Sequence, residues 1–324
     1  MALYLVRRLV NYVVLLVLAT FVAYMLASAT FDPLASLVGR NPPVPEATLA
    51  AKRAALHLDD NPVLRYLKWL GDVVRGDFGQ TVAAGSVNDE LGTRLLVSLR
   101  LVTLGTVLGA VLGTLLGAYS AVRQYKLFDH LATAATFVLL STPILVLAPI
   151  AKWIAVQFNQ SMGHTVIQFT GETTAGAPPG LWNEILDRAN HLLLPTVVLT
   201  LFTLGSYSRY MRGSMLDELG ADYIRTARAK GLTRGKAILR HGFRTALIPM
   251  AALFAFGMSA VITGATFTER VFGWFGMGDW LVFGITSQDI NITLAVTFFS
   301  AVSVLLAGFL TDLVTAALDP RVRT

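Results

Sequence analysis

The charged side chains best suited to bind another molecule are concentrated between residues 217 and 244. Residues 221–230 contain good helix formers, and Gly231 follows them as a plausible helix stop. The surface of this helix would be strongly basic, through Arg225, Arg228 and Lys230. A solvated basic loop would account for the charge alone, but it does not require an ordered helix that ends at a glycine.

Sequence patterns for nucleotide, metal or thiol chemistry are absent. No G-x-x-x-x-G-K-[ST] pattern occurs, and Gly273, Gly276 and Gly278 suit a tight turn better than a dinucleotide-binding loop. If the protein uses ATP, another chain must bind it. The chain has no cysteine, and its five histidines show no metal-binding spacing. They are His57, His130, His164, His191 and His241. We therefore expect no catalytic residue, no metal and no cofactor bound by this chain.

The apolar stretches of the chain carry few polar groups. No acidic residue lies at the middle of any of them, which counts against a proton-driven carrier and a carboxylate-based membrane hydrolase. Ser259, Thr263 and Thr266 follow one another at spacings of four and three, so they are candidates to line a translocation path. The alternative is that these hydroxyls bond to the backbone of their own helix.

The composition indicates an all-α integral membrane protein. Hydrophobic residues make up 54% of the 324 residues and charged residues only 14%, against about 25% charged in soluble domains. Six uncharged stretches reach the roughly 20 residues that a membrane-spanning helix needs. They are Leu9–Phe31, Leu101–Val122, Leu131–Ala151, Ala189–Ser208, Thr245–Thr268 and Ile290–Thr311. Residues 153–171 are also uncharged but too polar to count.

The distribution of basic residues predicts the orientation of these six helices. If the N-terminus is cytoplasmic, the inner segments hold 15 basic and five acidic residues, whereas residues 32–94 hold seven and eight. This excess follows the positive-inside rule, places both termini in the cytoplasm, and explains the net charge of +6 without nucleic acid. A cleaved signal peptide is the alternative for the N-terminus, but 23 uncharged residues exceed its usual apolar run of about 7–15.

The predicted spans divide the chain into segments. Residues 1–31 form the N-terminus and first span, 32–94 an external region, 95–316 the core with spans two to six, and 317–324 a cytoplasmic tail. Within the core, residues 209–245 form the basic inner loop. The segment 152–190 is expected to be an irregular external loop, because its second half is rich in Gly and Pro. No internal repeat is visible, which weakens an inverted-repeat carrier.

The external region is expected to contain one amphipathic helix. Asn61 and Pro62 suit a helix start, and Gly76 a helix end. Its apolar face would consist of Val63, Leu67, Leu70 and Val74. We expect this face to pack on the membrane helices; docking of an external partner is the alternative.

A glycine repeat marks the second span. Small residues four apart let membrane helices approach closely. The repeat consists of Gly105, Gly109, Gly113 and Gly117. It is expected to pack two helices of this chain, and an interface with a second chain remains open.

The segment Asp222–Leu232 resembles the coupling loop of ABC importer permeases. In the general form of that loop, Glu-Ala-Ala is followed after three residues by Gly, and only Ala227 and Gly231 match it. The variant Asp-Tyr-x-Arg-Thr-Ala-Arg-Ala-Lys-Gly-Leu is typical of peptide and nickel permeases and matches throughout. The matching residues are Asp222, Tyr223, Arg225, Thr226, Ala227, Arg228, Ala229, Lys230, Gly231 and Leu232. Further resemblance lies in Gly76–Gly79, His191–Leu216, Ala246–Pro249, Glu269–Phe272 and Asp319–Arg321, so it covers nearly the whole chain.

This resemblance points to the B-type permease of dipeptide or oligopeptide importers, with the fold of a type I importer. It implies a pathway shared with a homologous second permease, two ATPase subunits or one fused ATPase that use ATP and Mg, and an extracytoplasmic substrate-binding protein. It also implies that the protein lies in the lipid of a bacterial plasma membrane. The implied substrate is a peptide, with nickel, glutathione or another small solute as alternatives. The segment 158–190 is longer than usual and matches no motif. A secondary carrier, a membrane enzyme and a structural scaffold are the rival readings.

Overall fold

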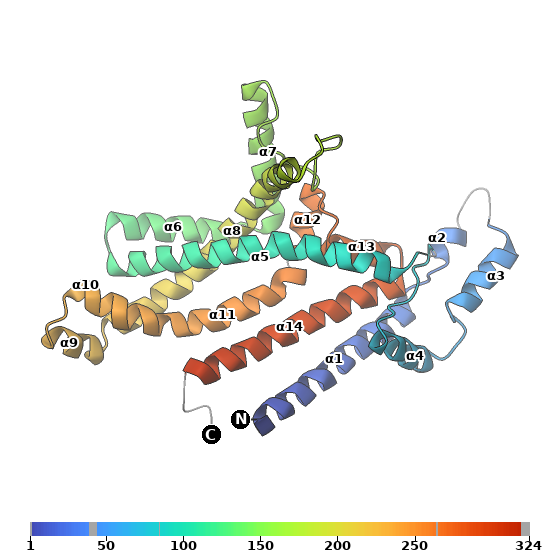
Figure 1. The fold of residues 1–324 in the computed structure, drawn as a ribbon, viewed down its shortest axis with the longest axis horizontal. Coiled ribbons are helices and arrows are strands. Elements are labelled where there is room, and N and C mark those ends of the chain that lie inside the picture. The colour runs from blue at the N-terminus through green and yellow to red at the C-terminus, as the bar shows by residue number, and fades with distance from the viewer. Residues whose placement is uncertain (1, 39–43, 84, 264, 319–324) are drawn as a thin grey trace. The chain divides into compact units, whose positions relative to one another are not determined.

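The computed structural model describes residues 2–38, 44–83, 85–263 and 265–318, and most of these residues are helical (Figure 1). The chain divides into two compact units, Met1–Ser98 with Phe275–Leu305, and Leu99–Trp274 with Leu306–Thr324. The first unit holds α1 (Ala2–Thr30), α2 (Ala35–Val38), α3 (Glu46–Ala55), α4 (Pro62–Val74), the start of α5 (Val87–Val122), α13 (Met277–Thr286) and most of α14 (Ile290–Leu318). The second holds the rest of α5, α6 (Leu127–Ser141), α7 (Ile144–Met162), α8 (Leu181–Leu219), α9 (Asp222–Ala229), α10 (Arg234–Ala237), the π-helix η1 (Ile238–Gly242), α11 (Phe243–Thr263), α12 (Thr266–Phe272) and the end of α14.

The described residues contain four helices long and apolar enough to cross a membrane, or five if one bent pair counts as a span. The four are Arg7–Thr30, Val87–Val122, Leu181–Leu219 and Ile290–Phe309. They contain the first, second, fourth and sixth predicted stretches, almost entirely. The fifth stretch corresponds to α11 and α12, and part of α11 has side chains outside the described residues. The six predicted spans are therefore matched only in part.

The third predicted span is not one helix. The prediction of a continuous helix over Leu131–Ala151 is wrong, because α6 and α7 meet at a bend of 106° (Figure 1). Pro143 lacks a backbone N–H and disfavours the helical conformation of the residue before it, and Thr142 accordingly has φ −93° and ψ 111°. The helix restarts after the proline and continues to Met162, through part of the segment that looked too polar to span a membrane.

The irregular segment before α8 is short and fixed by hydrogen bonds. It runs from residue 163 to 180, so the loop expected over 152–190 is helical at both ends. The N–H of Gly171 donates to the carbonyl of Phe272 at 2.8 Å. Arg100 on α5 pairs with Glu172 at 2.6 Å. These contacts tie the segment to α5 and α12 within the second unit.

The glycine repeat of α5 lies directly against α8. A Cβ atom placed on Gly105 would come within 2.5 Å of the Leu199 side chain, and one on Gly117 within 2.2 Å of the Ser208 carbonyl oxygen. A Cβ atom placed on Gly109 or Gly113 would come within 2.6 or 2.8 Å of atoms of the same helix, α8. Such approaches are possible only without side chains at these positions, so the repeat sets how closely two helices of this chain pack.

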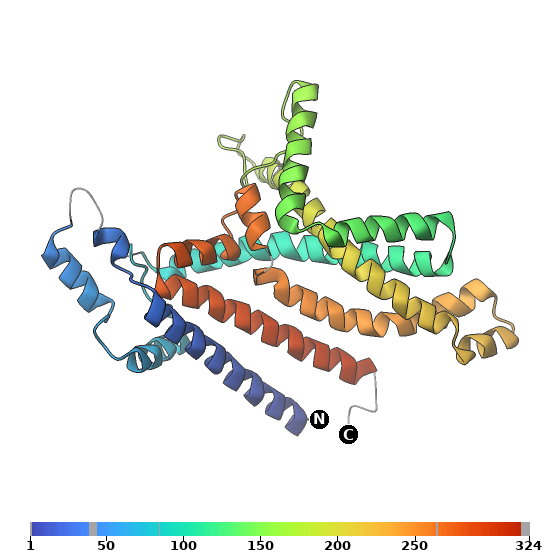
Figure 2. The ribbon, with the colours of Figure 1, turned by 180° about the vertical axis from the view of Figure 1, so that it is seen from behind.

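In the first unit, α4 packs against α1 (Figure 2). Its start is as predicted, since the Asn61 side chain accepts a hydrogen bond from the N–H of Val63 and Pro62 opens the helix. The predicted contact face is wrong. The buried residues of α4 are Tyr66, Trp69 and Val73, whereas Val63, Leu67 and Val74 of the expected face are exposed. Aromatic rings supplied by α1 favour the Tyr66 face.

Candidate functional site

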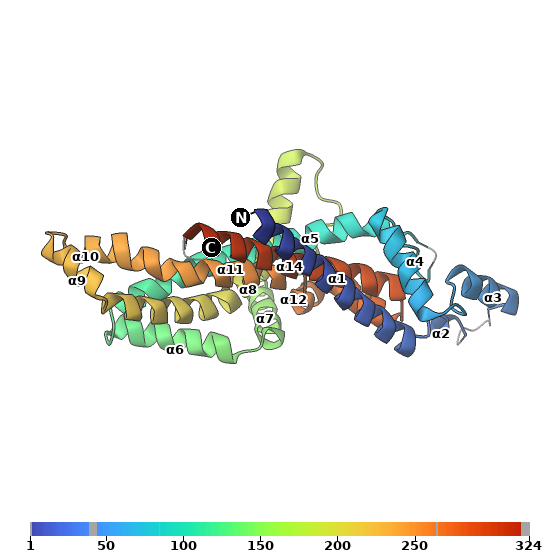
Figure 3. The ribbon, with the colours of Figure 1, turned by 90° about the horizontal axis from the view of Figure 1, so that it is seen from below.

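The segment between α8 and α11 contains α9, α10 and η1, and it lies at the far ends of α8 and α11 (Figure 3). Its first helix, α9, stops after Ala229. Gly231 then takes φ +92°, a left-handed conformation that glycine adopts without steric cost. The N–H of Gly231 donates to the carbonyl of Arg228 at 3.0 Å, and the N–H of Leu232 donates to the carbonyl of Ala227 at 3.2 Å. This pair of bonds is a Schellman motif, and it ends the helix where the sequence placed a stop.

Apolar side chains attach α9 to α10. Ile224 and Ala227 are buried and pack with Ala237 of α10, and Leu232 covers the same cluster. The Leu232 contact is the hydrophobic partner that commonly accompanies a Schellman motif. Ile224 was missed by the motif comparison, because its position was the one left unspecified. The spacing 224–227 on a short helix was the available signal.

The opposite face of α9 is exposed and rich in basic groups. Its exposed positions in and just after the helix are Asp222, Tyr223, Arg225, Thr226, Arg228, Ala229, Lys230 and Gly231. Arg225 lies 3.6 Å from Asp222, but both side chains are largely in solvent, so this pair contributes little. The residues predicted from the sequence therefore divide into an anchored part, Ala227 and Leu232, and an accessible part.

Tyr223 connects α9 back to α8. Its hydroxyl donates to the carboxylate of Glu218. Partial burial, together with this carboxylate, raises the pKa of Tyr223, so the phenol stays a neutral hydrogen-bond donor. Beside it is an open hollow lined by Tyr223, Arg240, His241, Arg244 and Thr245. Basic groups thus lie both on the face of α9 and in the hollow next to it, an arrangement suited to an acidic protein surface.

An apolar core lies next to the segment that contains α9, α10 and η1. It brings side chains of α5, α8, η1 and α11 together. Its buried members are Ala110, Ala118, Ala121, Tyr207, Met211, Met215, Ile238, Ala246 and Met250. Because α8 runs without a break into the turn before α9, a displacement of α9 acts on this core through a rigid helix.

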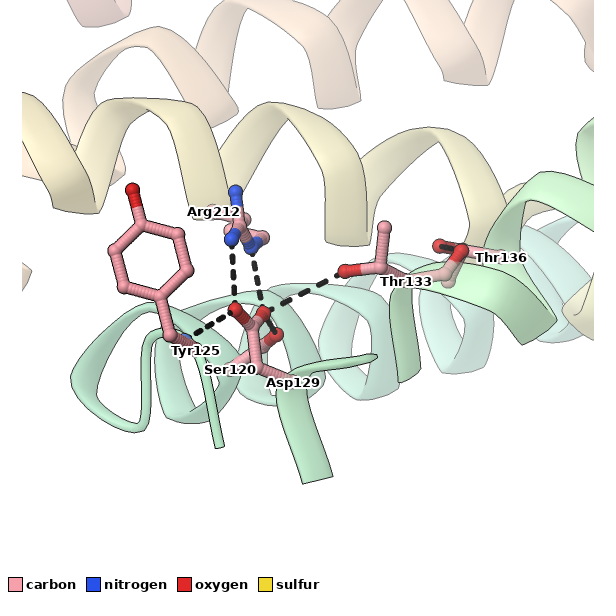
Figure 4. Close-up of polar contacts among 6 residues, drawn as sticks. All are labelled: Ser120, Tyr125, Asp129, Thr133, Thr136 and Arg212. Atoms are coloured by element: carbon pink, nitrogen blue, oxygen red, sulfur yellow. Dashed lines mark hydrogen bonds and ion pairs between the residues drawn. The ribbon is translucent and has the colours of Figure 1, made fainter. Parts of the chain in front are cut away.

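Next to this core, a polar cluster joins α5, α6 and α8 (Figure 4). Arg212 of α8 donates from Nε and Nη2 to the two carboxylate oxygens of Asp129 at 2.7 and 2.8 Å. Ser120 of α5 donates to the same carboxylate, as does the N–H of Tyr125 at 3.0 Å. Asp129 is only 2% exposed, and every one of these donors favours its charged form.

This polar cluster also holds a strained turn. Tyr125 has φ +64°, a left-handed conformation that tyrosine rarely adopts. Its N–H is fixed by Asp129, which lies in the first turn of α6. The carboxylate thus fixes the turn between α5 and α6, and it also joins α6 to α8. In the sequence, Asp129 is simply one of the five acidic residues of the inner segments, because its partner Arg212 lies 83 residues away.

A cavity lies between α5, α8 and α11 in the second unit. Its lining includes five residues that carry hydroxyl groups, Thr106 on α5 and four residues of α8. Those four are Thr203, Ser206, Tyr207 and Tyr210. The wall is otherwise apolar, and it includes Gly257 of α11, whose missing side chain leaves room for the Tyr207 hydroxyl to donate to the carbonyl of Leu253 at 3.0 Å.

The structure locates only some of the path residues that were predicted on the fifth span, Thr245–Thr268. The side chains of Ser259 and Thr263 lie outside the described residues, and Thr266 is the first residue of α12. Thr266 does not line the cavity, and Ala265 next to it does. The hydroxyls that the structure brings together come instead from α5 and α8. Within the described part of the chain, no group of three or more His, Cys, Asp or Glu side chains is placed to hold a metal.

Comparison with protein families matches two parts of the chain. Residues 113–324 match the family described as "Binding-protein-dependent transport system inner membrane component". Residues 1–89 match the N-terminal family described as "Binding-prot-dependent transport system membrane comp, N-term". Together these matches include the polar cluster, α9 and nearly the whole cavity.

Curated relatives are similar over nearly their whole length. The oligopeptide transport system permease protein OppB of Mycobacterium tuberculosis (strain ATCC 25618 / H37Rv) is 51% identical over 320 residues, covering 99% of this chain and 98% of the relative. The oligopeptide transport system permease protein AppB of Bacillus subtilis (strain 168) is 31% identical, covering 99% of each. The dipeptide transport system permease protein DppB of Escherichia coli (strain K12) is 29% identical, covering 95% and 96%.

Proposed function

Because the chain belongs to the family of binding-protein-dependent transport system inner membrane components, we propose that it is the membrane-spanning permease subunit of an ATP-driven peptide importer. The relatives' names, oligopeptide and dipeptide permease, support the substrate class. The observation that carries the proposal on this chain is α9, a short helix anchored on one face and presenting an accessible basic face on the other. Such an element suits contact with a separate ATPase subunit.

The proposed assembly contains this chain, a homologous second permease, two ATPase subunits or one fused ATPase, and a substrate-binding protein outside the membrane. ATP and Mg act on the partner subunits. The proposed topology places both termini and α9 in the cytoplasm of a bacterium, as the distribution of basic residues predicts. Lipid surrounds the apolar helices, and nucleic acid has no part in the function.

The proposed mechanism transmits movement through rigid contacts. Closure of the ATPases moves α9, whose buried side chains pack against α10 and move it as well. The continuous α8, held to α5 by the glycine repeat and to α6 by Asp129–Arg212, transfers that movement to the walls of the cavity. We propose this cavity as this chain's share of the translocation path. A change in access requires that each state have different contacts, and these interfaces are the places where contacts differ.

A vesicle experiment tests the function. Vesicles are prepared with the chain alone, with both permeases and the ATPases, and with the full set supplied with binding protein. Uptake of a labelled oligopeptide is then measured with ATP or a non-hydrolysable analogue. We expect uptake only with the full set and ATP. Uptake by the lone chain in an ion gradient would instead establish a secondary carrier.

A further inference from the structure

The apolar side of α4 has no partner among the described residues of the chain. Leu64, Leu67 and Val74 are 58%, 56% and 83% exposed, and Val63 is 44% exposed. The polar residues Arg65, Lys68 and Asp72 share another face, about 100° or more around the helix from Leu67. The third face, with Tyr66, Trp69 and Val73, is buried. The helix therefore has a contact face between one apolar and one polar side.

The contacts of α4 place it deep along α1 rather than at its end. The Tyr66 hydroxyl donates to the carbonyl of Val17 at 2.9 Å and lies 3.0 Å from the Thr20 hydroxyl. The Tyr66 ring lies 5.2 Å from that of Phe21 and 5.6 Å from that of Tyr24. Thr20 and Tyr24 precede the end of the span at Thr30 by ten and six residues, which corresponds to about 15 and 9 Å at 1.5 Å per residue.

These depths lie inside the hydrocarbon layer. The uncharged run of α1 is bounded by Arg8 and Asp32, so the layer of about 30 Å must fit between them. A point 9 to 15 Å from the end of the span lies between the layer's surface and its middle. On α1 itself, Leu18, Val22 and Leu26 are exposed at the same level. The apolar side of α4 thus emerges beside a helix surface that already faces lipid.

We propose that α4 is embedded in the membrane, lying in one leaflet with Leu64, Leu67 and Val74 against lipid chains. Its remaining groups fit this placement. Tyr66 and Trp69 are the residue types enriched at membrane interfaces. Lys68 pairs with Asp60 at 2.9 Å, and Arg65 lies 5.8 Å over the Tyr24 ring, so the basic side chains reach the surface with partners. An interfacial helix of this kind buries its apolar face by about 5–10 Å.

The leaflet follows from the proposed topology, which makes it the outer one. The embedding itself depends only on the contacts with α1. The segment between the first two spans is therefore not simply external, and α4 widens the lipid-facing surface of the subunit.

Spin labels test the depth of each face. Leu67→Cys and Val74→Cys are compared with Lys68→Cys and Asp72→Cys, in a chain that has no native cysteine. Each variant is labelled with a nitroxide and reconstituted with its partner subunits in lipid vesicles. Collisions with oxygen, which concentrates in lipid, and with a water-soluble nickel chelate are measured by power saturation.

We expect at least a several-fold higher ratio of oxygen to nickel accessibility at positions 67 and 74 than at 68 and 72. Equal nickel accessibility on both faces would place α4 in water and overturn the proposal. Low accessibility to both reagents at 67 and 74 would also overturn it, because a protein partner would then cover the face. Peptide uptake by the same vesicles reports separately on the proposed function.

Discussion

The individual residue that the structure adds to the candidate site is Asp129. A buried carboxylate that loses its partner is left charged in a poorly hydrated place, which typically costs about 3–5 kcal/mol. Because Arg212 is 27% exposed, we expect the lower end of that range, about 3 kcal/mol, for Arg212→Met. Melting temperature in detergent and membrane levels measure the loss.

Two further variants control this prediction. Arg209→Met on the same helix removes a cation–π contact with Phe137, at 4.9 Å, and should cost no more than about 1 kcal/mol. The double variant Asp129→Asn with Arg212→Met removes both charges but keeps a side-chain oxygen that can accept from the Tyr125 N–H, and should recover most of the stability. A double variant as unstable as Arg212→Met would show that the unpaired charge is not the cause.

Gly231 is the second residue with a specific consequence. A Cβ atom at this position would meet no atom within 4 Å outside its two chain neighbours, so close packing is not what requires a glycine here. The cost of Gly231→Val comes from φ +92° instead, on the order of 1–3 kcal/mol. We expect normal membrane levels, weaker binding of the ATPases and little peptide uptake.

The matched control is Gly231→Asn, since asparagine tolerates the left-handed region. It should keep most of the uptake, and Arg225→Ala should lose less than Gly231→Val because an exposed charge contributes little. Uptake of labelled peptide is measured beside pull-down of the ATPase subunits. Full association and uptake in Gly231→Val would return the segment to a plain basic loop.

At the scale of the element, the interface of α5 with α8 is the tightest feature. Gly117→Ala would bring its Cβ atom to 2.2 Å from the Ser208 carbonyl oxygen, which is backbone and can yield only if the helices separate. We expect a loss of about 1–3 kcal/mol. Gly92→Ala on the same helix meets nothing within 4 Å and should leave the melting temperature unchanged or slightly higher. Equal effects of the two variants would contradict close packing.

Sequence patterns predicted elements with local causes better than elements with distant ones. The Asn61 cap, the stop at Gly231 and four of the apolar spans depend on neighbouring residues, and all are present. The break at Pro143 was also local, but the long uncharged run around it concealed the bend. The buried face of α4 depended on α1 aromatics some 45 residues away, and the Asp129–Arg212 pair on a residue 83 positions away. Periodicity cannot identify such partners.

At the scale of the whole molecule, the proposed function requires α9 and the segment around residue 80 to lie on opposite sides of the membrane. Gln80 and Thr233 are exposed, so a cysteine at either position is accessible to reagent on its own side. The side chain of Thr233 makes no capping hydrogen bond, and its replacement should not disturb α10. The absence of native cysteine means that any labelling of this chain reports the introduced residue.

We expect Gln80→Cys to react with a membrane-impermeant maleimide in intact cells, and Thr233→Cys to react only after the cells are opened. The physical reason is the charge distribution. Residues 209–245 carry nine basic residues, which resist translocation, whereas the charges of residues 32–94 nearly balance. Denatured samples of both variants, which should label equally, control for expression. Labelling of Thr233→Cys in intact cells, with Gln80→Cys protected, would place α9 outside, where no ATPase could bind it, and the proposed coupling would fail with the topology.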